Sequence, residues 1–560
     1  MLSQPLADAA ITGLGLAGAA ILPSRAKLAL LRGLATLAKG RMPLVLLGTA
    51  AAILVARLCC LPFLPRPTPI VPDEFSHLLV AETLAGGRLS NPAHPMWRHF
   101  ETLFVLQRPT HASAYPPVQG MILASGLLVA GDPWFGVLLG VAGMCAAIVW
   151  MLRAYVTPFW ALYGGLLAGA GYGLVGYWAN SYWGGAGAAI GGALLFGAVP
   201  RIASGARAGN AAVLAAGIFV LANSRPYEGF LICLPAASWL AWTFARKPEH
   251  TPKLPLLVLA AVIIAGTIMT CWYNLRVTKR ALLLPYNAYI QQYAASPAFI
   301  WQSPREAPAY GDKFLRDAHL SFRREYEEYS SLRYTAVRST EKLAGIADFY
   351  VGPFWPVVLV LLPDMMRQRR VRLLLVSLAL CLSGILLTVG FHRHYAAPCT
   401  CIFILLMVEA FRRVHLWSRP AGIALLISAP VSWLAVQILE MHTPRLPSSV
   451  LARPAIQARI AAERGQHIVF VHYGPHHPLG EEWVYNPPDI DRAQIIWARD
   501  MGHKQNRELI EYFPGRTLWT LEPDWPGVRL SRYTSTGTAA DWRGAVENPN
   551  SSSTLNARPN

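Results

Sequence analysis

Charged residues are scarce in this chain of 560 amino acids. Asp, Glu, Lys and Arg make up 14% of the sequence, whereas soluble domains contain about 25%. Because 54% of the residues are hydrophobic and gather in repeated long runs, the scarcity of charge indicates a polytopic membrane protein rather than a soluble enzyme. The formal net charge of +18 does not indicate a nucleic-acid partner, because the basic residues form short clusters between the apolar runs.

Disulfide and metal-binding patterns are also missing. The eight cysteines show no CxxC spacing, and several lie inside apolar runs, so they are interpreted as small apolar side chains. We predict no cofactor. A divalent metal at Asp73 and Glu74, with His77 or His111, is the less favoured alternative because no element has clustered ligand spacing. The sequence also shows no internal repeat and no evident cleavable signal peptide.

Apolar runs predict an all-α polytopic membrane protein with about eleven spans of about 20 residues each. The predicted spans are 43–64, 134–152, 159–178, 183–199, 210–222, 227–244, 254–273, 346–362, 373–390, 396–411 and 421–439. A further apolar run, 115–130, is short and begins with a Pro-Pro pair, so it is predicted to be re-entrant or juxtamembrane.

The distribution of basic residues supports this count. If 115–130 does not cross the membrane, the basic N-terminal segment and the short basic loops all fall on one side, as the positive-inside rule requires. These loops contain Arg153, Arg201, Arg207, Arg246, Lys247, Lys253, Arg367, Arg369, Arg370, Arg372, Arg412, Arg413 and Arg419. We therefore predict a multi-pass protein of the bacterial cytoplasmic (inner) membrane, with residues 1–42 cytoplasmic.

The remaining segments are predicted to lie on the opposite, periplasmic or extracellular face. They are a first outer loop (65–133), a long outer loop (274–345) and a small α/β C-terminal domain (440–534). Residues 313–342 mix charges with apolar residues, which predicts a helix that lies on the membrane surface or roofs a cavity. In the tail, 467–472 and 516–521 read as strands and 506–512 as a helix. The polar end, 535–560, is predicted to be disordered.

The most informative stretch follows the first span. Asp73 and Glu74 are adjacent carboxylates at the membrane boundary, and a partly desolvated carboxylate has a raised pKa that suits a general base. The alternative is structural: Asp73 could cap a helix over 74–85, with acids favoured in its first turn. Both interpretations can hold together, since a cap also fixes the carboxylate.

Two other boundary segments carry charge beside aromatic residues. One is 223–228 (Asn-Ser-Arg-Pro-Tyr-Glu), and the other is 392–395 (His-Arg-His-Tyr). Arginine suits the bidentate binding of a phosphate, whereas the structural alternative is anchoring at the membrane interface. The turn 180–185 (Asn-Ser-Tyr-Trp-Gly-Gly) could stack on a sugar, although an aromatic belt is the favoured interpretation.

Three motifs in this order carry a family resemblance. The stretch 73–82 (Asp-Glu followed by a helix), the turn 86–92 and Tyr115-Pro116-Pro117 before the next helix resemble the integral-membrane glycosyltransferases of the GT-C fold. The resemblance is to the protein O-mannosyltransferase and aminoarabinose-transferase branch, and it covers residues 42–439 but not the tail. It implies inverting transfer of a sugar from a polyprenyl-phosphate donor to a lipid, glycan or protein acceptor at the outer face.

The resemblance also implies residue roles. Asp73 is the implied base, and Glu74 the neighbour that tunes it or contacts the acceptor. Glu101 matches a second acidic residue of some relatives, but Thr102 follows it where a basic residue is frequent, so Arg98 and His99 are the substitutes for a phosphate contact. The predicted substrate-binding residues are Glu101, His77, Arg98, Tyr115, Arg225, Glu228, His392, Arg393, His394 and Tyr395.

Two other functional classes remain open. A transporter or flippase of a lipid-linked or small polar substrate would need polar residues or broken helices near the membrane centre and an inverted repeat. A non-catalytic partner in envelope assembly is the third possibility. The ionisable residues lie at span ends and no repeat is evident, which favours the transferase.

Overall fold

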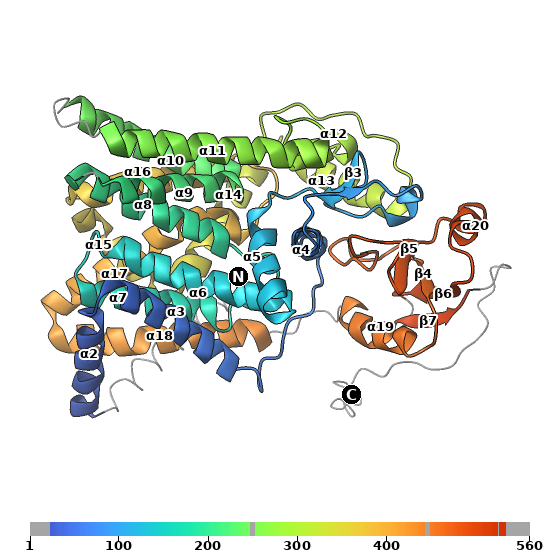
Figure 1. Ribbon diagram of the computed structural model, residues 1–560. Coiled ribbons are helices and arrows are strands. Elements are labelled where there is room, and N and C mark those ends of the chain that lie inside the picture. The colour runs from blue at the N-terminus through green and yellow to red at the C-terminus, as the bar shows by residue number, and fades with distance from the viewer. Residues whose placement is uncertain (1–22, 206, 247–252, 443–448, 525, 534–560) are drawn as a thin grey trace.

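The protein consists of a long helical bundle with a smaller α/β unit at one end (Figure 1). The computed structural model describes residues 23–205, 207–246, 253–442, 449–524 and 526–533. The bundle contains α3 (Met42–Cys59), α6 (Pro133–Leu152), α7 (Pro158–Ala168), α8 (Ala186–Gly205), α9 (Ala208–Ala222), α10 (Pro226–Ala245), α11 (Lys253–Thr278), α14 (Leu332–Val351), α15 (Trp355–Met365), α16 (Arg369–Leu386), α17 (Thr400–Trp417) and α18 (Arg419–His442).

Eight helical segments among the described residues are long and apolar enough to cross a membrane. They are Met42–Cys59, Pro133–Leu152, Ala186–Gly205, Pro226–Ala245, Lys253–Thr278, Leu332–Met365, Arg393–Trp417 and Arg419–Leu439. The chain is therefore a multi-pass membrane protein, and the count of eleven spans stays a prediction. The other three predicted spans coincide with α9, which is short, with α16, which begins with arginines, and with α7.

The predicted span 159–178 is not one continuous helix. Helix α7 ends at Ala168, and a π-helical turn, η2 (Gly169–Gly173), follows it. Small residues are needed there, because a Cβ on Gly171 would lie 2.6 Å from the ring of Trp433 in α18. The glycines that allow this close approach also weaken the helix.

Burial separates the centre of the bundle from its lipid-facing rim. In the most apolar 18-residue stretch of Arg393–Trp417, 94% of the residues are buried, whereas 6% are buried in the corresponding stretch of α11. Helix α11 exposes Leu257, Ile264 and Ile268, which suits contact with lipid tails. Helix α17 therefore forms the core of the bundle, and α11 lies at its edge.

The segment 115–130 forms a short apolar helix that is not among the eight candidate spans. It contains α5 (Val118–Ala130), which at 13 residues is about 20 Å long. The Val118 N–H donates to the carbonyl of Asn223 at one end of α5, while Asp132, just beyond the other end, pairs with Arg66 of the first outer loop at 2.6 Å. One end of α5 thus contacts the break between α9 and α10, and the residue beyond its other end contacts the start of the first outer loop. The re-entrant or juxtamembrane placement of this segment stays a prediction.

Basic residues gather at the opposite end of the bundle. Arg153 donates to the carbonyl of Ala38 at the end of α2 (Ser24–Ala38), which lies across the bundle in Figure 1. Arg201 of α8 donates to the carbonyl of Trp150 in α6. The basic turns therefore share one end with α2, as the charge distribution predicted. The side of the membrane on which they lie stays a prediction.

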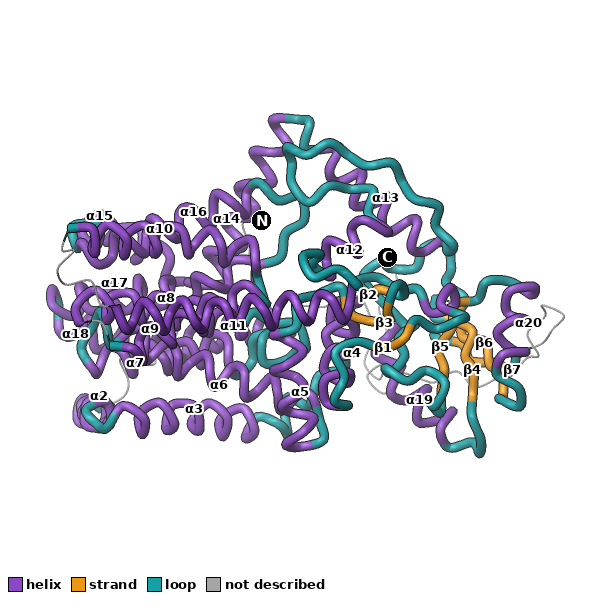
Figure 2. The backbone as a smooth tube through the Cα atoms, turned by 45° about the horizontal axis from the view of Figure 1, so that its top comes forward, coloured by secondary structure: helices purple, strands orange, loops and turns teal. Residues whose placement is uncertain are grey.

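The other end carries the remaining elements (Figure 2). They are α4 (Pro72–Ala85), η1 (Trp97–Phe100), the antiparallel strands β1 (Asn91–Pro92), β2 (Val105–Leu106) and β3 (Thr110–Ser113), and the helices α12 (Pro285–Tyr293) and α13 (Lys313–Glu328). The single helix predicted over 313–342 is two helices, because the chain turns at 329–331 between α13 and α14.

The tail forms a four-stranded mixed sheet in the order β5-β4-β6-β7. Its elements are α19 (Arg453–Ala461), β4 (His467–Val471), β5 (Ile495–Arg499), α20 (His503–Tyr512), β6 (Thr517–Glu522) and β7 (Arg529–Arg532). Strands β4 and β6 and helix α20 match the predicted elements, whereas β5 and β7 were not predicted. The predicted disordered segment, 535–560, and most of the N-terminal segment lie outside the described residues.

Candidate functional site

The first turn of α4 gives its two carboxylates different environments. Helix α4 begins at Pro72, after the N-cap residue Val71, so the prediction that Asp73 caps a helix starting at residue 74 is wrong. Glu74 caps the helix instead, because its carboxylate accepts hydrogen bonds from the N–H groups of Ile70 (2.8 Å) and Val71 (3.2 Å). It accepts a third from the N–H of Tyr182 (3.0 Å). Glu74 is therefore a buried anchor of α4.

Asp73 has a side-chain partner. The hydroxyl group of Tyr115, from the predicted Tyr-Pro-Pro motif, donates a hydrogen bond to Asp73 Oδ1. Burial raises the pKa of Asp73 to about 6, although the bond from Tyr115 and the positive charge of Arg225 lower it. A carboxylate with this pKa is ionised at neutral pH and can still accept a proton, as a general base must.

Aromatic rings surround the Tyr115 side chain. His77, one helical turn after Asp73, stacks on it with a centroid distance of 4.7 Å. Tyr286 of α12 stacks at 6.1 Å, and Phe104 lies at 5.4 Å. Burial lowers the pKa of His77 to about 3, so its ring is neutral. These rings fix the Tyr115 hydroxyl, and with it the orientation of Asp73.

Arg225 enters the site from the break between α9 and α10. Pro226 begins α10 and leaves Arg225 as its N-cap residue. The Arg225 guanidinium lies over the ring of Tyr395, 4.4 Å from its centroid. Glu228 lies buried in the first turn of α10, close enough to interact electrostatically with Arg225. The structure thus brings two predicted boundary segments together beside Asp73.

The second boundary segment forms an aromatic group within η5 (Arg393–Cys399) and the residue before it. The rings of His392 and His394 are parallel, 5.3 Å apart, and the Trp183 ring lies 4.9 Å from each. The Tyr177 hydroxyl is 3.1 Å from His394 Nδ1. Arg393 lies in the same turn.

Glu101 and Arg98 were predicted to bind substrate, but their contacts lie outside the cluster around Asp73. The Glu101 carboxylate accepts a hydrogen bond from the Tyr293 hydroxyl (2.9 Å). Its main-chain carbonyl accepts one from Arg499 in the C-terminal sheet. Arg98 is exposed, and its guanidinium lies 5.6 Å from the ring of Trp97. None of these contacts involves the cluster around Asp73, so the structure does not join Glu101 and Arg98 to it.

Three aromatic residues of the site were not predicted to bind substrate: Tyr286, Tyr177 and Trp183. Trp183 lies in the turn that the sequence favoured as an aromatic belt. Tyr286 follows the proline that begins α12, deep in the long outer loop. Nothing distinguishes it in sequence from the other 20 tyrosines.

No group of three or more His, Cys, Asp or Glu side chains is arranged to hold a metal ion within the part of the chain that the structure describes. His111, one ligand of the less favoured metal alternative, lies buried in β3, where its Nδ1 is 3.1 Å from Gln107 Oε1. The carboxylate oxygens of Glu74, another of those ligands, accept main-chain N–H groups. The prediction that no cofactor is needed remains untested.

Comparison with known proteins identifies the fold. No protein-family model matches the chain, and no curated protein matches its sequence. The structure of ArnT, the aminoarabinose transferase, from Cupriavidus metallidurans bound to undecaprenyl phosphate superposes with a TM-score of 0.51 at 10% identity, over 85% of this chain and 92% of that one. Since ArnT is a GT-C glycosyltransferase, the predicted resemblance is confirmed at the level of the fold.

More distant similarity extends to an archaeal enzyme. The oligosaccharyltransferase of Archaeoglobus fulgidus in its apo form has a TM-score of 0.39 at 10% identity, over 77% of this chain and 62% of that one. AglB from the same organism, in complex with an inhibitory peptide and a dolichol-phosphate, has a TM-score of 0.38 at 11% identity, over 86% of this chain and 69% of that one.

Proposed function

We propose that this chain, which has the GT-C fold, transfers a sugar from a polyprenyl-phosphate donor to an acceptor at the outer face of the cytoplasmic membrane. The observation that carries this proposal is Asp73, a carboxylate with a pKa of about 6 that is oriented by Tyr115 and lies near Arg225. The undecaprenyl phosphate bound to ArnT supports the donor class. The acceptor is a lipid, glycan or protein that presents a hydroxyl or amine.

The reaction is a direct displacement. The acceptor oxygen or nitrogen attacks the anomeric carbon while its proton passes to Asp73. As the new bond forms, the bond from the anomeric carbon to the phosphate oxygen breaks, and polyprenyl phosphate leaves with the electron pair. Because attack and departure occur on opposite faces of the sugar, the configuration is inverted. Asp73 can fill this role because Tyr115 occupies Oδ1 and leaves Oδ2 for the proton.

Arg225 is the residue that we assign to the donor phosphate. A guanidinium matches two phosphate oxygens and stabilises the charge that develops on the leaving group. The face of Tyr395 holds it on one side, and Glu228 balances its charge when no donor is present. Tyr286 and His392 retain solvent-accessible surface. We assign these rings to contact with the sugar, whose apolar faces pack against aromatic surfaces.

The Asp73→Asn variant tests this function. Asn keeps the size of the side chain but cannot accept the acceptor's proton, so we expect kcat to fall by at least about 100-fold. Turnover would be measured in proteoliposomes with a polyprenyl-phosphate sugar donor, and binding of the lipid should persist. Glu74→Gln should lose less, because an amide oxygen can still accept some of the main-chain hydrogen bonds that Glu74 accepts.

Asp132→Asn is the matched control. Asp132 lies at the same end of the bundle, caps α6 by accepting the N–H of Trp134 (2.8 Å) and has no contact with Tyr115. Asn caps a helix nearly as well as Asp, so this variant should keep its turnover. If Asp73→Asn also stays within a few-fold of the unaltered protein, Asp73 is not the base.

A further inference from the structure

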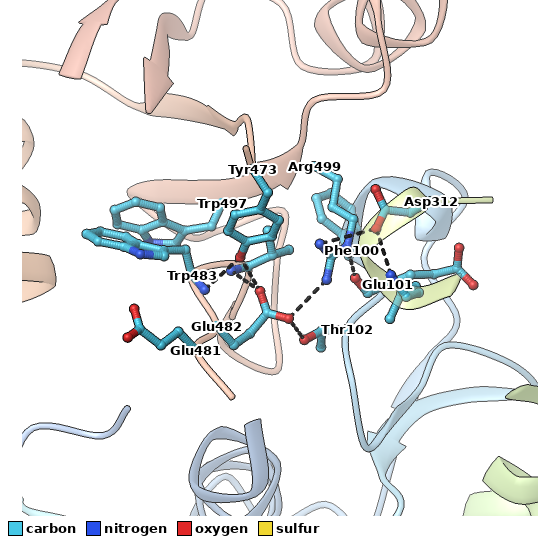
Figure 3. A network of polar contacts seen from close by, with 12 residues as sticks. Phe100, Glu101, Thr102, Asp312, Tyr473, Glu481, Glu482, Trp483, Trp497 and Arg499 are labelled. Atoms are coloured by element: carbon cyan, nitrogen blue, oxygen red, sulfur yellow. Dashed lines mark hydrogen bonds and ion pairs between the residues drawn. The ribbon is translucent and has the colours of Figure 1, made fainter. Parts of the chain in front are cut away.

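A buried ionic cluster joins the C-terminal sheet to two outer loops (Figure 3). Arg499 ends β5, and 1% of its side chain is exposed. Its Nη2 lies 2.9 Å from Glu482, its Nη1 lies 3.5 Å from Asp312, and its Nε donates to the main-chain carbonyl of Glu101. One guanidinium therefore contacts the C-terminal domain, the first outer loop and the long outer loop at once.

Glu482 completes this cluster. One carboxylate oxygen accepts hydrogen bonds from Arg499 and from the Thr102 hydroxyl. The other accepts bonds from the Tyr473 hydroxyl and the Val484 N–H. Arg499 and Glu482 thus hold two consecutive residues of the first outer loop, Glu101 and Thr102. Asp312 connects the cluster to α13, because its side chain accepts the N–H of Leu315 and caps that helix.

Stability alone is a weak explanation for such a cluster. Moving two charges out of water is unfavourable, and well-packed apolar residues can often replace a buried ion pair without loss of stability. An ionic cluster differs from apolar packing because its geometry is directional. Here its hydrogen bonds fix the main chain of residues 101 and 102 relative to the C-terminal sheet.

The fixed loop continues to the catalytic carboxylate. Phe104, two residues after Thr102, has a left-handed main chain (φ 60°) and packs against Tyr115. Its carbonyl accepts a hydrogen bond from Ser76 (2.6 Å), which lies on α4 about one turn after Asp73. The loop that the cluster holds therefore contacts Tyr115 directly, and it also contacts α4, the helix that carries Asp73.

The C-terminal domain also contacts α4 directly. The Arg453 guanidinium of α19 lies 4.9 Å from the Phe75 ring centroid, and the ring of Tyr485 packs on the same phenylalanine at 4.9 Å. Phe75 is buried and lies two residues after Asp73. The same domain therefore holds the helix that carries the base and the loop that supports its tyrosine partner.

We propose that the C-terminal domain positions the catalytic base, with Arg499, Glu482 and Thr102 as positioning residues. The cluster holds the first outer loop so that Phe104 supports Tyr115, and Tyr115 keeps Asp73 in one orientation. This inference rests on the proposed function of Asp73. It gives the domain a role in turnover, although the domain itself contributes no reacting atom.

The sharpest test is Thr102→Val. Valine matches threonine in shape but lacks the hydroxyl, so only the hydrogen bond to Glu482 is removed and the Arg499–Glu482 ion pair remains. We expect kcat to fall about three- to tenfold with little change in the KM for the donor, because one neutral-to-charged hydrogen bond is lost. We also expect the acidic limb of the kcat–pH profile to move to higher pH, since a loosened Tyr115 lowers the Asp73 pKa less. Thr102→Ser, which restores the hydroxyl, should return both quantities toward those of the unaltered protein.

Glu482→Gln applies a stronger perturbation, and Glu409→Gln is its matched control. Glu409 is also a buried carboxylate paired with arginines, Arg412 and Arg413, but it lies at the basic end of the bundle. Both variants should lower Tm, because each leaves arginine charge poorly compensated. Only Glu482→Gln should also change kcat and the pH profile.

The outcomes separate this inference from the proposed function. If Thr102→Val and Glu482→Gln keep the kcat and pH profile of the unaltered protein while Asp73→Asn is inactive, Asp73 remains the base and the positioning role of the C-terminal domain is wrong. If Asp73→Asn remains active, the proposed function itself falls. Should Glu482→Gln fail to fold, Thr102→Val and Thr102→Ser still decide the question, because both keep the ion pair.

Discussion

The two ends of the bundle use arginine in opposite ways. At the basic end, Arg153 and Arg201 donate to main-chain carbonyls at helix ends, and Arg413 pairs with Asp364 at 2.6 Å and with Glu409. At the other end, Arg225 rests on an aromatic face beside the carboxylate of Asp73. Arginines of the first kind fasten helices to one another. Arg225 instead lies on the ring of Tyr395, and we propose that it binds the donor phosphate through the edge of its guanidinium.

Replacing Arg225 is the strongest test of this difference between the arginines at the two ends of the bundle. We expect Arg225→Ala to weaken donor binding by about 1.5–3 kcal/mol, the contribution typical of a hydrogen bond to a charged group, which is about 10- to 150-fold in Kd. Binding would be measured by titrating the purified protein with polyprenyl phosphate. Arg413→Ala is the control from the basic end and should lower Tm without changing that affinity. Equal donor affinities in all three proteins would leave Arg225 as a membrane anchor only.

A smaller effect is expected from Tyr115→Phe, which keeps the ring and removes the hydrogen bond to Asp73. That bond lowers the Asp73 pKa, so its loss should raise the pKa above about 6. A rise of about 0.5–1 unit would reduce the ionised base at pH 6, and therefore kcat, by about two- to sixfold. Near pH 8 the base is ionised in both proteins, so the part of the loss that comes from the pKa should vanish and only the part that comes from the freer orientation of Asp73 should remain. A profile that falls equally at every pH would show that the hydroxyl does not act through the Asp73 pKa.

The third prediction concerns membrane topology, and the substitutions that test it should leave activity unchanged. Arg369, at the start of α16, and Lys504, in α20, are both exposed. Single cysteines at these positions in a cysteine-free background should react with a membrane-impermeant maleimide from opposite sides of sealed vesicles. The topology rests on the gathering of basic turns at one end of the bundle. Labelling of both positions from the same side would contradict it.

The neighbouring residues Asp73 and Glu74 show what could and could not be predicted from the sequence. The pair Asp73 and Glu74 could be located from its place after the first span, and an acidic first turn of α4 was expected. Glu74 anchors the helix through the nearby N–H groups of Ile70 and Val71, whereas its third donor, the N–H of Tyr182, comes from a distant turn and could not be predicted. The contacts of the Trp183 ring with His392 and His394 could not be predicted for the same reason, and the choice between an aromatic belt and sugar stacking for its turn stays open.

Local composition by itself determined that this chain is a multi-pass helical membrane protein, because apolar runs and scarce charge are properties of each segment taken alone. It also located Asp73, the Arg225 and His392–Tyr395 boundary segments, and two of the four strands in the tail. Tertiary structure alone decided that Tyr286 meets Tyr115, that Arg225 meets Tyr395 and that Arg499 meets Glu101. The partners in each pair are far apart in the chain, and their contact depends on how whole helices pack, which no local pattern encodes.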